Sequence, residues 1–337
     1  MPDSGTQIIL CNLPIRFDTY SGCSHGCEYC FANQKGRSIG DIRKKEGPLA
    51  LENFINGKRT KRTNWCDWDI PLHWGGMSDP FQPCEINLRN SLDCMSVFKS
   101  KKYPFVFSTK GGVVAREEYT NVLKDCNAVG QISMASPQYD EIEKGAPSYY
   151  DRLKVLKVVA QNTKRAIVRV QPYTERIHAF LVEEGLKDFR NNGAYGIVIE
   201  GIKSSVKAKG LVKIGSDFVY DEEFLKQKFI EIKRISHGIG LKFFCGENRL
   251  RYLGDSLTCC GCDGVEGFMP NKSNLNYHFW GGGIKYNTAM EAHGSGGCFA
   301  AFVQSWELGQ YVFKSTYREL MDSSKDVKTF RAILGFN

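Results

Sequence analysis

The stretch Cys23-Ser24-His25-Gly26-Cys27-Glu28-Tyr29-Cys30 places three cysteines on one short loop with the spacing C-x3-C-x2-C. Three thiolates on one loop can bind three irons of a cubane cluster, and the fourth iron is then left open to another ligand. A structural zinc site is the alternative, but it normally takes four protein ligands, and His25 lies too close in the loop to complete an unstrained tetrahedron. The spacing therefore predicts a 4Fe–4S cluster on Cys23, Cys27 and Cys30.

Outside this loop, strand-like and helix-like segments alternate. Apolar runs predict buried strands at residues 15–20, 69–74, 103–109, 128–135, 165–170, 194–199 and 241–245. Helical periodicity appears at residues 85–99, 117–125, 149–161, 178–191 and 221–236. About six βα units in series indicate an α/β fold with a parallel sheet, closed into a partial (β/α)6 TIM-like barrel. In such barrels the chemistry lies at the carboxyl ends of the strands.

The alternation stops after residue 245, which predicts two parts of the chain. Residues 8–245 form the partial barrel, and residues 246–337 form an extension rich in Cys and Gly. We expect the extension to pack on the barrel mouth and to contain a final helix near residues 311–323.

Composition points to a cytoplasmic protein with no membrane partner. The 337 residues include 13 cysteines, yet no signal peptide and no long apolar run is visible. Clustered cysteines in a reducing compartment more often bind metal than form disulfides. The formal charge of +8 suits a polyanionic partner. The basic run at residues 58–62, followed by Trp65, is either a solvated loop or a phosphate-contacting loop with a ring for stacking.

The motifs resemble those of the radical SAM superfamily, and more narrowly its spore photoproduct lyase-like branch. The resemblance covers roughly residues 8–200. It rests on Tyr20-Ser21-Gly22-Cys23, Gly75-Gly76-Met77-Ser78-Asp79-Pro80-Phe81, Phe107-Ser108-Thr109-Lys110, Gln131-Ile132-Ser133, Glu143-Lys144-Gly145-Ala146-Pro147-Ser148 and Asp151-Arg152-Leu153. It implies an enzyme in which the cluster binds S-adenosylmethionine and cleaves it reductively to a 5′-deoxyadenosyl radical. That radical abstracts hydrogen from the substrate.

The resemblance also implies which residues surround S-adenosylmethionine. Gly75, Gly76 and Ser78 would meet its amino group, and Lys110 would pair with its carboxylate. Ser133 would bond its ribose or carboxylate, and Tyr29 would pack against the adenine. The alternative for each is a turn or strand-end residue without a special role, and Asp79 could simply cap the segment that follows it.

One departure affects the reaction. Spore photoproduct lyase has a hydrogen-returning cysteine at the position of Gly76, and Cys84 lies a few residues beyond that place. The resemblance therefore leaves open an isomerase-type rearrangement of a base or a photoproduct-type lyase reaction. We list Cys84 and Cys245 as candidate catalytic thiols. Arg169 and Glu200, at strand ends, would contact substrate or form an internal salt bridge.

A second group of cysteines, Cys245, Cys259, Cys260 and Cys262, lies near the start of the extension. It predicts an auxiliary iron–sulfur cluster. Zinc, or no metal with one thiol as hydrogen-atom donor, is the alternative. Cys298, His278 or His293 could replace one ligand.

The expected substrate is a nucleobase or nucleic acid of the thymine-type pyrimidine class. Trp65, Tyr277 and Trp280 could stack on bases. A reductase or a flavodoxin or ferredoxin would supply electrons. A small-molecule or peptide substrate is the alternative, and a non-enzymatic metal-binding module is a further one.

Overall fold

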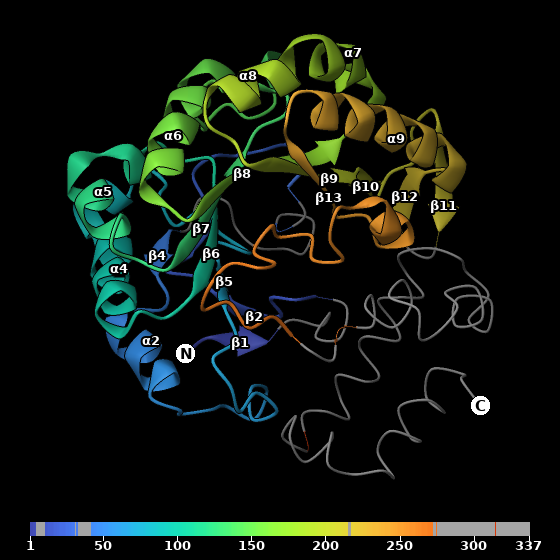
Figure 1. Cartoon of the computed structure of the whole chain (residues 1–337). Coiled ribbons are helices and arrows are strands. Elements are labelled where there is room, and N and C mark those ends of the chain that lie inside the picture. Colours follow the sequence, from blue (N-terminus) through green and yellow to red (C-terminus); the bar gives the residue numbers. More distant parts are fainter. Residues whose placement is uncertain are drawn as a thin grey trace.

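A mostly parallel sheet runs through the centre of the molecule, with helices in an arc around its outer face (Figure 1). The computed structural model describes residues 1–4, 11–30, 32, 42–214, 217–271, 274 and 314. In this part of the chain the strand order is β1-β2-β5-β6-β7-β8-β9-β13. Their bounds are β1 (Asp3–Ser4), β2 (Ile15–Phe17), β5 (Leu72–Trp74), β6 (Phe105–Thr109), β7 (Ala128–Ser133), β8 (Arg165–Tyr173), β9 (Gly196–Gly201) and β13 (Lys242–Cys245).

Every neighbouring pair from β2 to β13 is parallel, and only β1 pairs antiparallel with β2. The six crossovers between these strands contain α2 (Pro48–Ile55), α3 (Glu85–Leu88) with α4 (Asn90–Lys101), α5 (Glu117–Leu123), α6 (Tyr149–Asn162), α7 (His178–Phe180) with α8 (Leu186–Asn191), and α9 (Glu222–Gly238). The predicted (β/α)6 partial barrel is therefore confirmed. Among the helices described, none is long and apolar enough to cross a membrane.

Local sequence explains where the helices begin. Ser148 caps α6 by accepting a hydrogen bond from Asp151 N, and Asp221 caps α9 by accepting from Glu223 N and Phe224 N. Pro48 occupies the first turn of α2, where its missing N–H costs nothing.

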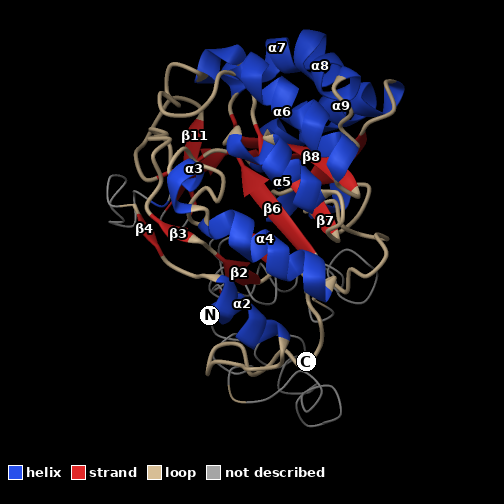
Figure 2. Ribbon diagram, turned by 90° about the vertical axis from the view of Figure 1, so that its left-hand side faces the viewer, coloured by secondary structure: helices blue, strands red, loops and turns tan. Residues whose placement is uncertain are grey.

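Strands β6 and β7 are buried on both faces, so their sequences read as continuous apolar runs. The outer face packs against the helices in an aromatic core, in which the rings of Phe98 and Phe105 stack with centroids 4.1 Å apart. The inner face carries a separate cluster around Val106, Val129 and Ile167. Figure 2 shows α4 lying over the strands from the side.

Some elements were not predicted. Helix α2 is mostly apolar in sequence but only eight residues long, and it buries Leu51 and Phe54. The predicted strand at residues 15–20 is interrupted, because β2 ends at Phe17 and a short β3 (Tyr20–Ser21) pairs with β4 (Arg43–Lys44). A three-stranded antiparallel sheet, β10 (Lys203–Ser204), β12 (Asp217–Tyr220) and β11 (Leu211–Ile214), is inserted after β9.

The described start of the extension does not lie at the barrel mouth, where it was predicted. Cys260, Cys262, Val265 and Phe268 pack into the inner cluster beside residues near the starts of β6, β7 and β8. Asn127, just before β7, donates from Nδ2 to Glu266 O at 3.4 Å. We call residues 259–268 the plug. It fills the amino-terminal end of the barrel interior rather than the mouth at the carboxyl ends. The predicted boundary at residue 245 stays a prediction, and the helix expected at residues 311–323 lies outside the described residues.

Candidate active site at the carboxyl ends of the strands

The three-cysteine loop follows β3 and is bonded to the segment after β7. Glu28 N donates to Ile142 O and Gly145 N donates to His25 O, both at 3.0 Å. A Cβ on Gly145 would lie 2.2 Å from Ser24 O, so the two segments touch through their backbones. This close approach fixes the loop across the ends of β5, β6 and β7.

The three thiols of the loop are partly or fully buried, and none is in a disulfide. Burial raises the pKa of Cys23 to about 12, and the nearby Asp79 carboxylate adds to the shift. Burial also raises the pKa of Cys27, whereas the Lys110 ammonium opposes that shift. Thiols become ligands as thiolates, so metal binding here would release protons.

His25 cannot serve as a fourth ligand without giving up its present bonds. Its Nδ1 lies 3.0 Å from Gly145 O and its Nε2 lies 3.0 Å from Asp79 Oδ2, and the side chain is 2% exposed. In the described part of the chain, no three His, Cys, Asp or Glu side chains converge on a position for a single metal ion. These observations disfavour the zinc alternative. Three thiols on a fixed loop fit the larger cubane cluster, whose fourth iron needs no protein ligand.

Asp79 is more than a cap, because it joins three segments at the strand ends. Its carboxylate accepts from Thr109 Oγ1 at 2.6 Å, from Lys110 N at 2.6 Å and from Phe81 N at 2.8 Å. Burial alone would raise the pKa of Asp79, but His25 and these hydrogen bonds lower it to about 2. An ionised carboxylate therefore holds the cysteine loop to the ends of β5 and β6.

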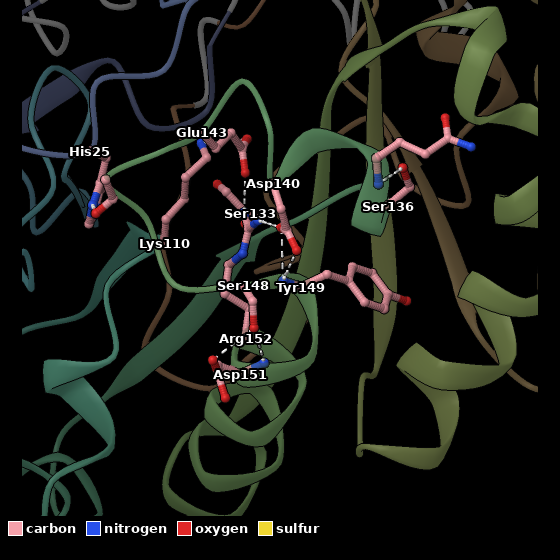
Figure 3. A network of polar contacts seen from close by, with 12 residues as sticks. His25, Lys110, Ser133, Ser136, Asp140, Glu143, Ser148, Tyr149, Asp151 and Arg152 are labelled. Carbon is pink, nitrogen blue, oxygen red and sulfur yellow. Dashed lines mark hydrogen bonds and ion pairs between the residues drawn. The ribbon is translucent and has the colours of Figure 1, made fainter.

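Lys110 and Tyr29 meet at a buried carboxylate that was not predicted as a site residue. Lys110 Nζ lies 3.7 Å from Glu143 Oε1 and 5.5 Å from the centroid of the Tyr29 ring, and the Tyr29 hydroxyl bonds Glu143. Figure 3 shows the Lys110 side chain extending towards Glu143. Arg152, which is fully buried, pairs with Glu143 Oε2 at 2.6 Å and donates to Ser133 O at 2.9 Å. Glu143 and Arg152 thus join Lys110, Tyr29 and the backbone of Ser133 at one site at the strand ends.

The other candidates for cofactor contacts lie after β5. Gly75 approaches β6 so closely that a Cβ would lie 2.5 Å from Ser108 O. Ser78 donates its hydroxyl to Tyr20 O, so that donor is already used inside the protein. A Cβ on Gly76 would lie 3.1 Å from Arg16 Cδ, and a cysteine there would press on the arginine.

A cavity of about 140 Å³ lies inside the barrel. A belt of hydrogen bonds crosses its wall from strand to strand. His73 Nε2 lies 3.0 Å from Ser108 Oγ, which donates to Gln131 Oε1 at 2.9 Å. The belt continues as Arg169 Nη1 donates to the same Gln131 oxygen at 3.1 Å.

Arg169 and Glu200 both line this cavity, as expected of substrate contacts, but they do not pair directly. Arg169 Nε donates to Gln171 Oε1 and Gln171 Nε2 donates to Glu200 Oε2, both at 2.6 Å. Glu200 also pairs with Lys203. The alternative of a direct Arg169–Glu200 salt bridge is therefore wrong, because Gln171 lies between them.

The second group of cysteines is arranged differently from the prediction. Cys245 lies on the outer face of β13, in the core shared with the helices, and its thiol donates to Glu247 O at 3.6 Å. Cys259, Cys260 and Cys262 face the inner cluster, where Cys11 joins them. Cys260 Sγ lies 3.3 Å from Cys262 Sγ. The set of four is thus divided by the sheet. Cys298, His278 and His293 lie outside the described residues.

Two other candidates lie away from the barrel cavity. Cys84 lies at the start of α3 and does not line the barrel cavity. Trp65 is 1% exposed and donates to Arg62 O, so it cannot stack on a base, and Arg59 is bonded to Phe54 O and Cys66 O. Arg62 pairs with Asp3, whereas Lys58 and Lys61 are exposed, so the phosphate-contacting alternative for the basic run stays a prediction. Tyr277 and Trp280 lie outside the described residues.

Comparison with known proteins identifies the fold. No protein-family model and no curated protein matches the chain. Among solved structures, spore photoproduct lyase complexed with dinucleoside spore photoproduct aligns with a TM-score of 0.54 at 16% identity, over 69% of this chain and 77% of that chain. A mutant of the same lyase with bound AdoMet and dinucleoside spore photoproduct aligns with a TM-score of 0.54 at 15% identity, over 68% and 76%. The expected resemblance is confirmed at the level of the fold, and the chain shares the partial barrel of spore photoproduct lyase.

Proposed function

We propose that the protein is a radical S-adenosylmethionine enzyme that acts on a thymine-type pyrimidine nucleobase or nucleotide. The observation that carries the proposal is the fixed loop with Cys23, Cys27 and Cys30, placed at the carboxyl ends of a radical SAM-type barrel. When bound, a 4Fe–4S cluster and S-adenosylmethionine would supply reductive cleavage to a 5′-deoxyadenosyl radical.

The residues of the chain have separate tasks in this proposal. Cys23, Cys27 and Cys30 would hold the cluster, and Asp79 would keep their loop in place through His25. The Lys110 ammonium is 15% exposed and pairs with Glu143 at 3.7 Å, so the cofactor carboxylate would share this ammonium with Glu143. A second cluster on Cys245, Cys259, Cys260 and Cys262 is not part of this proposal.

An internal substrate is favoured over an extended nucleic acid. Trp65 is buried and cannot stack on a base, whereas the barrel encloses a polar cavity. Support for a pyrimidine comes from the fold shared with spore photoproduct lyase, which the solved complexes show with dinucleoside spore photoproduct. An isomerase-type reaction is favoured over photoproduct cleavage, because Gly76 is packed against Arg16 and offers no thiol.

The test is formation of 5′-deoxyadenosine by protein reconstituted with iron and sulfide without oxygen and reduced with dithionite. We expect the product with wild type and its loss in a Cys23→Ala/Cys27→Ala/Cys30→Ala variant, together with the loss of most bound iron. Cys84→Ala is the matched control, since it removes a half-buried thiol outside the loop and should leave both readouts unchanged. Wild type that carries an intact cluster and yet forms no 5′-deoxyadenosine would contradict the proposal.

Adding thymidine 5′-monophosphate, DNA or neither separates the substrate classes. Stimulation by the nucleotide above that by DNA supports an internal pyrimidine substrate. Stimulation by neither would direct the search to the small-molecule or peptide alternative.

A further inference from the structure

The barrel cavity carries more positive charge than its own wall can neutralise. Among the described residues that line it, four are basic, namely Arg16, Arg169, Lys203 and Arg251, and Glu200 is the only carboxylate. Glu200 is already paired with Lys203 and bonded to Gln171. The guanidinium groups of the three arginines therefore line a cavity in which no described carboxylate forms an ion pair with them.

Each of these arginines is held by neutral groups. Arg16 Nη1 contacts Met77 Sδ at 3.4 Å, and Arg169 donates to the amide oxygens of Gln131 and Gln171. Arg251, 3% exposed, donates to Cys245 O at 2.5 Å and to Asn248 Oδ1 at 2.7 Å. Among the described residues, none of the three makes an ion pair. Neutral acceptors fix where the guanidinium groups lie but do not cancel their charge.

The positive charge of these arginines affects the pKa of a neighbouring histidine. Burial, together with the charges of Arg169 and Arg16, lowers the pKa of His73 to about 3. His73 is therefore neutral at physiological pH and adds no charge of its own. The cavity remains positive because of its arginines alone.

Physical chemistry favours a negative ligand at such a place. Uncompensated charge away from water is costly, so an anion that enters the cavity gains the full attraction of the three groups. Guanidinium groups match the oxygen geometry of carboxylate and phosphate, and they bind these groups in a bidentate manner. The volume of about 140 Å³ suits one small group rather than a whole nucleotide.

We propose that this cavity binds an oxyanion carried by the substrate, a phosphate monoester or a carboxylate, between Arg16, Arg169 and Arg251. The inference rests on the proposed function for the identity of the rest of the substrate. It places the charged end of that substrate inside the barrel, against the polar belt.

The test is isothermal titration calorimetry of the cluster-loaded protein without oxygen. The probes are inorganic phosphate, thymidine 5′-monophosphate, thymidine and orotate, a pyrimidine that carries a carboxylate. We expect one or both of the anionic pyrimidines to bind at least about tenfold more tightly than uncharged thymidine, because charge-assisted hydrogen bonds are lost with the anion. Inorganic phosphate tests the phosphate monoester as the source of the oxyanion, and orotate tests the carboxylate. Equal binding of all three pyrimidines would overturn the inference.

Arg16→Gln and Arg169→Gln test the assignment to these side chains. Each should weaken binding of the preferred anion about tenfold or more and leave thymidine binding unchanged. Arg234→Gln is the matched control, since Arg234 is an exposed arginine on α9 and its loss changes the net charge equally. Anion binding that is insensitive to both cavity variants would place the ligand elsewhere.

Two further readouts keep the inference separate from the proposed function. Competition between S-adenosylmethionine and phosphate would assign the guanidinium groups to the cofactor and overturn the inference. Formation of 5′-deoxyadenosine without substrate tests the radical chemistry alone. An active enzyme with no anion binding refutes only the inference, whereas anion binding by a protein that never cleaves S-adenosylmethionine refutes only the proposed function.

Discussion

His73 shows how a single side chain reports the electrostatics of the barrel interior. It lies on β5, faces the cavity and contacts Ser108, and its pKa is lowered to about 3 by burial and by Arg169 and Arg16. In the unfolded chain the same ring has its ordinary pKa near 6.5. The unfolded state therefore binds more protons than the folded state between these two values.

This difference predicts a pH dependence of stability. As pH falls below about 6.5, the free energy of unfolding should decrease, with one proton contributing up to about 1.4 kcal/mol per pH unit. His73→Asn keeps a polar side chain beside Ser108 but does not titrate. Urea unfolding at pH 7.0, 6.0 and 5.0 should therefore show a shallower decline for the variant. Parallel curves would mean that His73 is protonated in the folded protein.

The three cysteines proposed as cluster ligands could be picked out from sequence because they lie within eight consecutive residues. Glu143 and Arg152 could not be assigned from spacing, although both lie in stretches that carried the resemblance. Their role depends on a buried ion pair that forms only when the segment after β7 folds over α6. Cys11 was likewise missed, since about 250 residues separate it in sequence from Cys259.

At the scale of elements, the cysteine loop and the segment after β7 behave as one unit. Their contact is made by backbone atoms on both sides, with Gly145 at the point of closest approach. The alternation of apolar runs was sufficient to predict the parallel strands and five of the helical segments, because strands buried on both faces carry a strong signal. It could not predict α2, which is only eight residues long, or the sheet of β10, β11 and β12, whose strands are short and partly exposed.

Gly145→Ala tests the closeness of this contact. The added methyl group would lie 2.2 Å from Ser24 O and 2.9 Å from His25 Cα, and these backbone atoms cannot move without shifting the loop. We expect the variant to bind clearly less iron than wild type on reconstitution, while circular dichroism shows the barrel still folded.

Gly238→Ala is the control for that experiment. Gly238 ends α9, and nothing lies within 4 Å of a Cβ there. This variant should bind iron like wild type and be slightly more stable, because alanine loses less entropy in a helix. Normal iron content in Gly145→Ala would show that the two segments can separate without harm.

At the scale of the whole molecule, the plug is hydrogen-bonded to the barrel strands, so this part of the extension belongs to the barrel. Arg165 Nη1 donates to Gly261 O at 3.0 Å and to Asp263 O at 2.7 Å, and Gln131 Nε2 donates to Cys260 O at 3.1 Å. The cavity is therefore closed partly by residues beyond the last strand. The sequence suggested an extension, but the end of the barrel that it covers depends on these long-range contacts.

Gly261 and Gly264 provide a matched pair for testing the plug. Both have positive φ, +71° and +70°, so alanine is strained at either position. Only at Gly261 would a Cβ meet another atom, Ile167 Cδ1 at 2.7 Å, whereas nothing lies within 4 Å at Gly264.

We expect Gly261→Ala to lower the free energy of unfolding by about 1–3 kcal/mol more than Gly264→Ala does, as overpacking in a core typically costs. Urea unfolding of the two variants measures the difference. Equal losses would show that the plug is not packed inside the barrel.

The position of the plug also bears on the order in which the protein is made. A ribosome synthesises the seven parallel strands first, and residues 259–268 emerge only after β13 is complete. Until then the apolar side chains around Val106, Val129 and Ile167 face an unfilled interior. The nascent chain thus carries an exposed apolar surface from the synthesis of these strands until the plug emerges, and the barrel can reach its final packing only after its last strand has left the ribosome.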